Sequence, residues 1–433
     1  MIIYNYEQSK AALEKLFKRG AEVDEKIVET VKKILHEVKT RGDEAVFHFT
    51  REFDRFELHA HNLVVDRDVL KSCYEKIDAT QRAILEEARD NIEAFHVNQK
   101  EESWLKEFPD NVRLGQRITP LDRVGVYIPG GQAFYPSTAM MNIVPAKIAG
   151  VREIVAVTPP TRFMDNPIIG ATLYMLGVDR VFLCGGAQAI AALAYGTEII
   201  PRVDKIVGPG NIYVSEAKRL VFGQVDIDMI AGPSEVVVLA QDQANPRWTA
   251  LDVLSQAEHR TGFESAMLIT DSQDFAEKVK TEIFELLKDV PYGEKVKAIL
   301  AEYGAIIVVD NMKQGAEVVN RIAPEHLEVV VKDVDAVLPL IRHAGAIFIG
   351  EYSSEPVGDY WAGPNHVLPT SGTARFFSPL GVYDFVKRSS LIYYSKEAIL
   401  KHGRKINQLA MTEDLIFHGR AVLERCEALE NEQ

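Results

Sequence analysis

Residues 353–372, SSEPVGDYWAGPNHVLPTSG, combine side chains suited to an active site with a backbone stiffened by glycine and proline. The segment has little helical or strand periodicity, so a loop is expected. A linker of this length is usually featureless, whereas this one carries Asp359, a potential metal ligand, and the imidazole of His366. An ordered surface loop is the alternative. The segment predicts an active-site loop if other segments supply matching chemistry.

A pair of potential ligands lies at the C-terminal end of the helical pattern of residues 247–258. Gln256 and His259 are three residues apart, so they project from the same face of a helical turn. A polar helix end that faces solvent would look the same. Asp359 and the C-terminal His418 could complete an oxygen and nitrogen donor set for a divalent ion, which zinc tolerates and manganese or cobalt could share. Because these four positions are far apart, no short motif establishes the site.

A candidate proton-transfer pair lies in the run APEHLE, residues 323–328. Glu325 and His326 are adjacent, directly after a proline and at the start of an apolar strand pattern. Strand edges are where parallel α/β folds place catalytic groups. A histidine beside a carboxylate suits proton abstraction near neutral pH, where a positioned base contributes ~10²- to 10⁴-fold in rate. An exposed polar dipeptide before a strand is the alternative.

Three glycine turns each follow a predicted strand and precede a predicted helix: PGG at 129–131, GGAQ at 185–188 and GPGN at 208–211. In this position backbone amides and a helix N-terminus can receive phosphate. None of the turns is a GxGxxG, so the dinucleotide fingerprint is absent and any nucleotide site must be atypical. The alternative is that at least one of these segments is only a tight turn between a strand and a helix and binds no ligand.

Helical and strand patterns alternate in two series along the chain. Residues 1 to about 110 read as helical, whereas short β-rich runs alternate with helical ones from Arg123, and a second such series begins at Glu235. This alternation implies parallel sheets covered on both faces. We therefore expect an α/β fold of two lobes, with parallel sheets resembling incomplete Rossmann folds and with N-terminal and C-terminal helical arms.

The patterns also suggest where these parts begin and end. The last helix is expected to start from Thr412 as N-cap, with Glu413 and Asp414 in its first turn, and to continue to Leu429. The expected parts are an N-terminal arm at 1–22, a first lobe at 23–123 and 235–376 with the candidate metal and catalytic residues, a second lobe at 124–234, and a C-terminal arm at 377–433.

Composition and charge narrow the class of protein. The chain has 433 residues, 47% hydrophobic and 26% charged, enough for two or three cored units. Its net charge of -14 argues against nucleic-acid binding and suits a cationic substrate or a metal ion. No run approaches the roughly 18 to 20 apolar residues of a membrane span, and the start lacks a basic cap before an apolar core. We expect a cytoplasmic protein that binds neither membranes nor nucleic acid.

The three cysteines, Cys73, Cys184 and Cys426, are far apart and include no CxxC pair. Neither a disulfide framework nor a thiolate zinc site is therefore indicated. Cys184 ends a predicted strand just before Gly185, where a thiol could attack an aldehyde. A small buried apolar role is the alternative.

Taken together, the motifs resemble histidinol dehydrogenase over nearly the full chain. The resemblance implies a homodimeric enzyme that uses one zinc per site and two NAD⁺ to convert L-histidinol, through the aldehyde, to L-histidine. Departures at Trp361, Pro364 and Arg260-Thr261 flank motif positions without replacing them. The matching strings are VGVYIPGG, PAKIAGV, GGAQAIAALAYGTE, GPGNIYVSEAKR, DMIAGPSEV, LSQAEH, APEHLE, GDYWAGPNHVLPTSGTARF and the pair Glu413 and His418.

The resemblance assigns roles position by position. It implies that His326 takes the alcohol proton as hydride leaves, and that Glu325 activates water to hydrate the aldehyde. It also implies that the C-terminal arm reaches the partner's site, so composite sites are expected. The implied zinc ligands are Gln256, His259, Asp359 and His418; the substrate contacts are Ser234, Gln256, His259, His326, Asp359, His366, Glu413 and His418; the NAD contacts are Tyr127, Gln188 and Asn211.

Three other functions fit parts of the sequence. A superfamily dehydrogenase for another alcohol is one, but Glu413, His418 and His366 suit a cation that bears an imidazole. A zinc hydrolase, with Glu325 activating a metal-bound water, is another; the absence of HExxH and the three glycine turns weigh against it. A non-catalytic metal- or nucleotide-binding protein would leave the many ionisable groups in loops unexplained.

Overall fold

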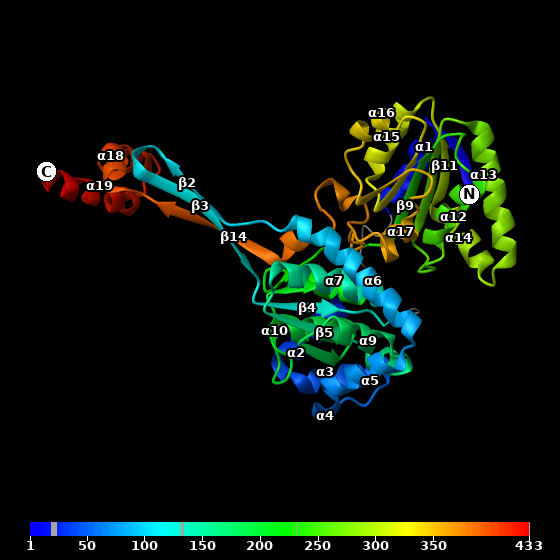
Figure 1. The fold of residues 1–433 in the computed structure, drawn as a ribbon, viewed down its shortest axis with the longest axis horizontal. Helices are drawn as coiled ribbons and strands as arrows, with labels where there is room; N and C mark the ends of the chain where they lie inside the picture. The colour runs from blue at the N-terminus through cyan, green and yellow to red at the C-terminus, as the bar shows by residue number, and fades with distance from the viewer. Residues whose placement is uncertain (19–23, 131–133, 231, 433) are drawn as a thin grey trace. The chain divides into compact units, whose positions relative to one another are not determined.

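A computed structural model describes residues 1–18, 24–130, 134–230 and 232–432. The chain forms two compact units, one made of Met1–Gln99 with Leu121–Phe385, the other of Lys100–Pro120 with Val386–Gln433 (Figure 1). None of the described helices combines the length and the apolar composition that a bilayer span requires.

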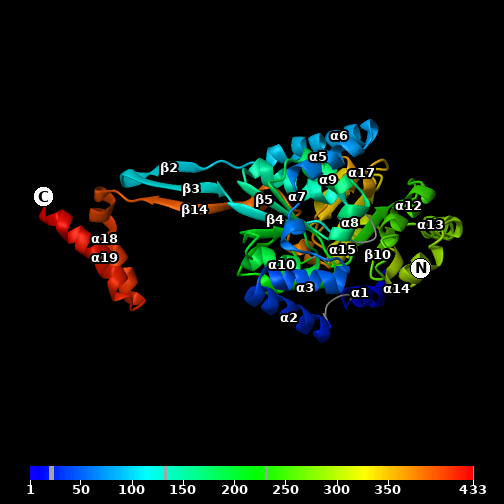
Figure 2. The same cartoon turned by 90° about the horizontal axis from the view of Figure 1, so that it is seen from below.

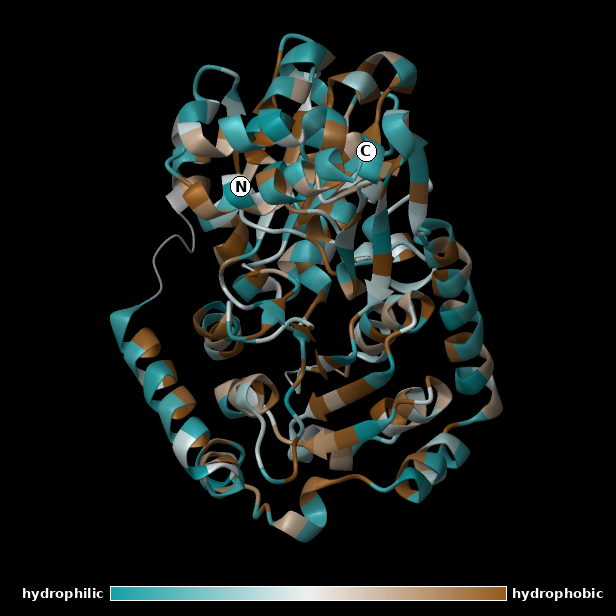
Figure 3. Ribbon diagram, turned by 90° about the vertical axis from the view of Figure 1, so that its left-hand side faces the viewer, coloured by the Kyte–Doolittle hydropathy of each residue, from teal (hydrophilic) through white to brown (hydrophobic). Residues whose placement is uncertain are grey.

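The first unit contains a five-stranded parallel sheet. Numbered along the chain, its strands lie in the order 3-2-1-4-5, which is five of the six positions of a doubly wound Rossmann sheet. The strands are apolar because helices cover both faces (Figure 3). The order across the sheet is β6 (Arg180–Leu183), β5 (Glu153–Thr158), β4 (Arg123–Tyr127), β7 (Lys205–Val207) and β8 (Asp226–Ile227).

A six-stranded parallel sheet follows later in the same unit. Its last five strands repeat the 3-2-1-4-5 order, and a strand from the start of the chain is added at one edge. Both sheets thus match the expected incomplete Rossmann pattern. The order across the sheet is β1 (Ile2–Asn5), β11 (Gly304–Val308), β10 (Ser265–Thr270), β9 (Glu235–Ala240), β12 (His326–Val330) and β13 (Ala346–Ile349).

Helices cover each sheet on two faces. On the six-stranded sheet, one face packs against α12 (Pro246–Ala257), α13 (Gln273–Leu286) and α14 (Gly293–Tyr303), and the other against α1 (Ser9–Lys18) and α15 (Met312–Ile322). The helices between β4 and β8 are α7 (Pro136–Ala149), α8 (Pro160–Asp165), α9 (Ile168–Met175), α10 (Gly186–Tyr195) and α11 (Ile212–Val221).

The helices of residues 25–96 pack with the five-stranded sheet. Apolar side chains such as Val31, Phe49 and Ile92 share one core with Val126 and Val155. The expected grouping of residues 23–123 with residues 235–376 differs from this packing, because amphipathic helices carry no mark of which sheet they cover. These helices are α2 (Glu25–Arg41), α3 (Asp43–Asp54), α4 (Ala60–Leu63), α5 (Arg67–Lys76) and α6 (Ala79–His96).

The start of the chain also differs from the expected helical arm. Ile2–Asn5 form β1 and pair with β11, and α1 follows; residues 19–22 of the arm lie outside the described residues. Four residues are too short for a strand to be recognised by periodicity alone.

The second unit is an antiparallel ribbon followed by two helices (Figure 2). The ribbon consists of β2 (Trp104–Phe108), β3 (Val112–Pro120) and β14 (Val386–Tyr393), so residues 100–120 join the C-terminal part of the chain. The helices are α18 (Lys396–Thr412) and α19 (Ile416–Asn431). Thr412 therefore ends a helix, and its expected role as an N-cap is wrong. Asp414, with φ of 56°, turns the chain before α19 begins.

Candidate active site

The predicted catalytic pair lies at the amino end of the six-stranded sheet. His326 opens β12 and is paired in register with Val236 near the start of β9. The ligand site of an open α/β sheet is usually at the carboxyl ends of its strands, whereas this pair lies at the amino ends. The helix α12 explains the difference, because a helix that follows a parallel strand runs back to the amino edge. It thereby delivers Gln256 and His259 to this edge.

His326 is held as a neutral imidazole with one free nitrogen. Its Nδ1 lies 3.0 Å from the backbone carbonyl oxygen of Glu235. A carbonyl only accepts, so Nδ1 carries the hydrogen and Nε2 carries the lone pair. Nε2 is buried and has no hydrogen-bond partner. Burial is the main cause that lowers the pKa of His326, to about 4. The imidazole is thus unprotonated at neutral pH, which leaves the lone pair of Nε2 available to a proton donor.

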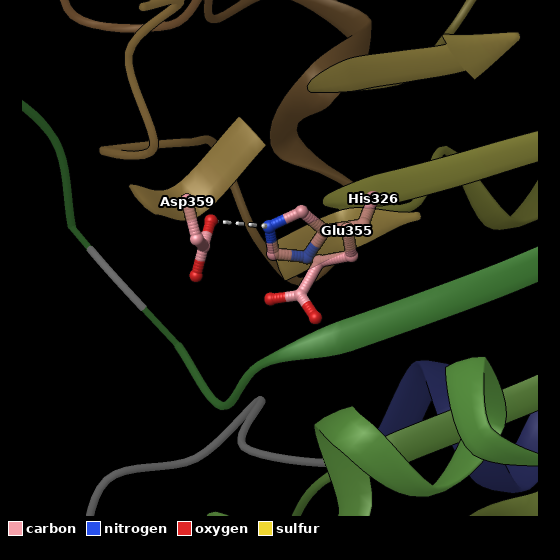
Figure 4. A group of neighbouring side chains, drawn as sticks. All are labelled: His326, Glu355 and Asp359. Carbon is pink, nitrogen blue, oxygen red and sulfur yellow. Dashed lines mark ion pairs between the residues drawn. The ribbon is translucent and has the colours of Figure 1, made fainter. Parts of the chain in front are cut away.

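Asp359 and Glu355 face this imidazole from one short helix, α17 (Glu355–Tyr360) (Figure 4). Nε2 of His326 lies 3.8 Å from Oδ1 of Asp359, and one potential ligand atom from each of the three residues lies within 4.8 Å of the other two. The predicted loop therefore contains a helical turn, which begins after Ser354 and places Glu355 and Asp359 on one face. Burial raises the pKa of Asp359 to about 6 and of Glu355 to about 8.

The donors at this edge fit a divalent cation. Gln256 is 1% exposed, and neither its amide oxygen nor its amide nitrogen has a hydrogen-bond partner. A buried amide without partners is costly unless a ligand satisfies it. With the carboxylate of Asp359 and the imidazole of His259, the amide oxygen of Gln256 supplies the nitrogen and oxygen atoms that zinc accepts. His259 is exposed two residues after the end of α12, and its charge acts on the pKa of both His326 and Glu355.

His366 is fixed by the same segment that carries Asp359. Its Nδ1 lies 3.0 Å from the backbone oxygen of Asp359, so Nε2 again carries the lone pair, 3.5 Å from Oγ1 of Thr138. Burial lowers the pKa of His366 to about 4. The neighbouring Asn365 donates to the backbone oxygen of Met141 at 2.6 Å, which ties the segment to α7. His366 is therefore a rigid, neutral side chain beside Asp359.

Glu325 and Ser234 complete the predicted residues of the first unit. An oxygen of Glu325 accepts from the Glu235 amide at 2.9 Å and lies 3.7 Å from Nδ1 of His326. Burial raises the pKa of Glu325 well above its ordinary value, and the charges of Glu235 and Asp359 reinforce the shift. Ser234 is half-buried directly before β9. Glu325 thus borders the imidazole as a carboxyl of unusually high proton affinity.

An acidic cluster, made of the buried Glu328 and Glu355 and the half-buried Asp252, joins the elements that carry these groups. Glu328 on β12 hydrogen-bonds with Asp252 on α12 and accepts from the Glu355 amide at 2.8 Å. Ser255 donates to the Glu355 carboxylate at 3.0 Å. The cluster therefore links the helix of Gln256 to the helix of Asp359. Glu355 is not among the site residues predicted from the sequence, although its position four residues before Asp359 is the signal that could have found it.

We expect Glu328→Gln to flatten the pH dependence of stability. Burial, with the charge of Asp252, raises the pKa of Glu328 to about 9 from 4.5. Between these values the folded protein holds a proton that the unfolded chain has lost, so the free energy of unfolding falls as pH rises, by roughly 1 kcal/mol per pH unit. Glutamine resembles the protonated acid, since it keeps an acceptor for the Glu355 amide and gains a donor for Asp252.

Thermal unfolding between about pH 6 and pH 9 measures this effect. Glu277→Gln, on the exposed face of α13, is the matched control and is expected to follow the wild type. An unchanged slope in Glu328→Gln would show that Glu328 is ionised in the folded protein.

A second pocket, which we name the nucleotide pocket after the predicted NAD contacts that line it, lies at the carboxyl end of the five-stranded sheet and has a volume of about 440 Å³. It borders β4 and β7, where the strand order reverses, which is the usual ligand position in such sheets. All three predicted NAD contacts line it: Tyr127 at the end of β4, Gln188 in the first turn of α10, and Asn211 at the N-cap of α11.

The walls of the nucleotide pocket carry polar groups that a ligand could satisfy. Gln188 is 1% exposed, and neither atom of its amide group has a partner. The Tyr127 hydroxyl accepts a hydrogen bond from the Gly186 amide at 3.2 Å, and burial raises the pKa of this hydroxyl. Gly186 has φ of 65°, and a Cβ there would lie 2.6 Å from the Gln188 amide oxygen, so this turn requires glycine. Gly130 also lines the pocket, whereas Gly131 lies outside the described residues.

The remaining predicted residues have separate locations. Glu413 and His418 belong to the second unit, where both are exposed, Glu413 between the two helices and His418 in the first turn of α19. All three cysteines are free and buried. Burial raises the pKa of the Cys184 thiol, which leaves it protonated and favours the apolar packing role over that of a nucleophile.

The chain is similar to known proteins over nearly its full length. The family model of histidinol dehydrogenase matches residues 17–426. A histidinol dehydrogenase of Aquifex aeolicus is 51% identical over 410 residues, 95% of this chain and 95% of that one. Another, of Halalkalibacterium halodurans, is 52% identical over 393 residues, 90% of this chain and 92% of that one.

A solved structure shows the same fold. The crystal structure of histidinol dehydrogenase from Elizabethkingia anophelis matches with a TM-score of 0.90 and 32% identity, covering 97% of this chain and 96% of that one. Sequence, fold and family model agree over nearly the full length. The chain therefore belongs to the histidinol dehydrogenase family, whose members are NAD-dependent oxidoreductases of histidine biosynthesis.

Proposed function

We propose that the protein oxidises L-histidinol to L-histidine through the aldehyde, in two NAD-dependent hydride transfers, as the last steps of histidine biosynthesis in the cytoplasm. The observation that carries this proposal is the buried Nε2 of His326, which bears a free lone pair 3.8 Å from Asp359. A positioned base of this kind is what removal of an alcohol proton requires.

The substrate's charge and shape suit the amino edge of the six-stranded sheet. L-histidinol carries an amine and an imidazole, and the side chains of Asp359 and Glu413 would offset its positive charge. Gln256, His259 and Asp359, with His418, would hold a zinc ion, which when bound would fix the substrate through its two nitrogens. Ser234 and His366 would border the bound substrate. Orientation of this kind can be worth effective molarities of ~10⁵ to 10⁸ M.

Proton transfers fall to the catalytic pair. His326 would take the alcohol proton in the first oxidation and act again in the second. Glu325 would take a proton from water as the aldehyde is hydrated, a task that its raised pKa favours. NAD, held by Tyr127, Gln188 and Asn211, would supply the hydride acceptor.

The protein would work as a homodimer with composite sites. Glu413 and His418, on the second unit of the chain, would then complete the site of the other subunit. We also propose that residues 124–234, with the helices of residues 25–96, form the nucleotide lobe, and that residues 235–376 form the lobe of the catalytic pair.

The test is the absorbance of NADH after L-histidinol is added to the purified protein with NAD⁺. We expect two equivalents of NADH for each substrate consumed. A zinc hydrolase or a simple binding protein would form none, and a dehydrogenase for another alcohol would turn over other alcohols in preference to L-histidinol.

A further inference from the structure

The nucleotide pocket contains an unexplained carboxylate. Asp54, the last residue of α3, is the one residue with a formal charge among the described residues that line the pocket. Its Oδ2 is buried and has no hydrogen-bond partner, and burial raises its pKa to about 6. Its charge also acts on the hydroxyl of Tyr127. The carboxylate therefore lies within the site that the NAD contacts form.

Asp54 is unfavourable for the fold at this position. A carboxylate at a helix C-terminus meets the negative end of the helix dipole, and a buried acceptor without a donor loses its hydration. Gln188, 1% exposed in the same pocket, also has no partner for its amide group. Two unsatisfied polar side chains of complementary chemistry in one pocket point to a ligand that bonds to both.

The chemistry of NAD decides which part Asp54 would meet; this step depends on the proposed NAD site. The pyrophosphate is anionic and would be repelled, whereas a ribose diol offers two neutral donors with the spacing of the two carboxylate oxygens. We propose that Asp54 accepts hydrogen bonds from the adenosine ribose hydroxyls of NAD and thereby selects NAD over NADP. The extra phosphate of NADP would replace one donor with negative charge beside Asp54. None of the described lining residues offers a cation to offset that charge.

The experiment measures the Kd of NAD⁺ and of NADP⁺ by calorimetry on the zinc-loaded protein. We expect the wild type to prefer NAD⁺ by more than about 100-fold, and Asp54→Ala to lose about 10-fold or more in NAD⁺ affinity while that preference narrows. Asp54→Asn keeps one acceptor, so its NAD⁺ affinity should lie between those of the wild type and Asp54→Ala. Glu52→Ala, which removes an exposed carboxylate from the same helix, is the matched control and should bind as the wild type does.

Two further readouts separate this role from others. Asp54→Ala should unfold at a higher temperature than the wild type, since an unfavourable charge is removed; a lower temperature together with unchanged NAD⁺ affinity would mean a structural role and overturn the proposal. Nicotinamide hypoxanthine dinucleotide lacks the adenine amino group but keeps the ribose. If it bound the wild type as weakly as NAD⁺ binds Asp54→Ala, Asp54 would read the base, and the ribose assignment would be overturned.

The outcome also distinguishes this proposal from the proposed function. If the wild type binds NAD⁺ tightly and Asp54→Ala binds it equally well with the same preference over NADP⁺, only the role of Asp54 is wrong. If the wild type binds neither dinucleotide, the NAD site itself is wrong.

Discussion

His326→Asn is expected to lower kcat for L-histidinol oxidation by about 10²- to 10⁴-fold and to leave the zinc content near that of the wild type. The variant loses the lone pair of Nε2, whereas the asparagine amide can still donate toward the Glu235 carbonyl that now holds Nδ1. Steady-state NADH formation and metal analysis of the same preparation measure both quantities.

The surface variant His61→Asn is the matched control, because His61 is exposed on the helix turn of residues 60–63. It should retain wild-type turnover. Full activity of His326→Asn would exclude this imidazole as the base, and loss of zinc together with activity would make it a metal ligand instead.

His259→Ala is expected to lose zinc and, with it, activity. Removal of a directly bound imidazole should weaken metal binding by more than the roughly 10- to 100-fold that is typical when an outer hydrogen-bond partner of a ligand is lost. Of the proposed ligands, Gln256, Asp359 and His418 would remain, so the site would lose one of its four ligands and one of its two nitrogen donors. The ratio of zinc to protein after dialysis measures the loss.

Glu258→Ala is the neighbouring control, since Glu258 is exposed and bonds to the Tyr292 hydroxyl. It should keep its zinc. If His259→Ala held zinc as firmly as this control, the metal would be bound by other residues, and the group of His326, Glu355 and Asp359 would be the next candidate.

The pocket at the carboxyl edge of the five-stranded sheet could be expected from the sequence because its signals are local. Glycine turns after apolar strands define the carboxyl edge of a parallel sheet, and strands of one sheet bring such turns together. Tyr127, Gln188 and Asn211 accordingly line one pocket. The neutral state of His326 could not be predicted, since it depends on the carbonyl of Glu235, which is distant in sequence.

The fold is less predictable where the sequence pattern of an element does not specify which other element it packs against. Amphipathic helices such as α2 and α6 show a buried face but not the sheet that covers it. Residues 100–120 carry no alternating pattern that marks a ribbon, because the residues of β2 are all exposed. At 412–414 the sequence resembles a helix start. In the structure α18 ends at Thr412, and the chain turns at Asp414 before the next helix.

The most direct test of the composite site is to mix His326→Ala and His418→Ala subunits after dissociation. Each variant alone should be nearly inactive, because every site lacks either the base or a metal ligand. Random reassociation should restore about a quarter of wild-type activity, since half of the dimers are mixed and one of their two sites is intact. If mixing restores nothing while the dimers exchange subunits, each site is built within one chain.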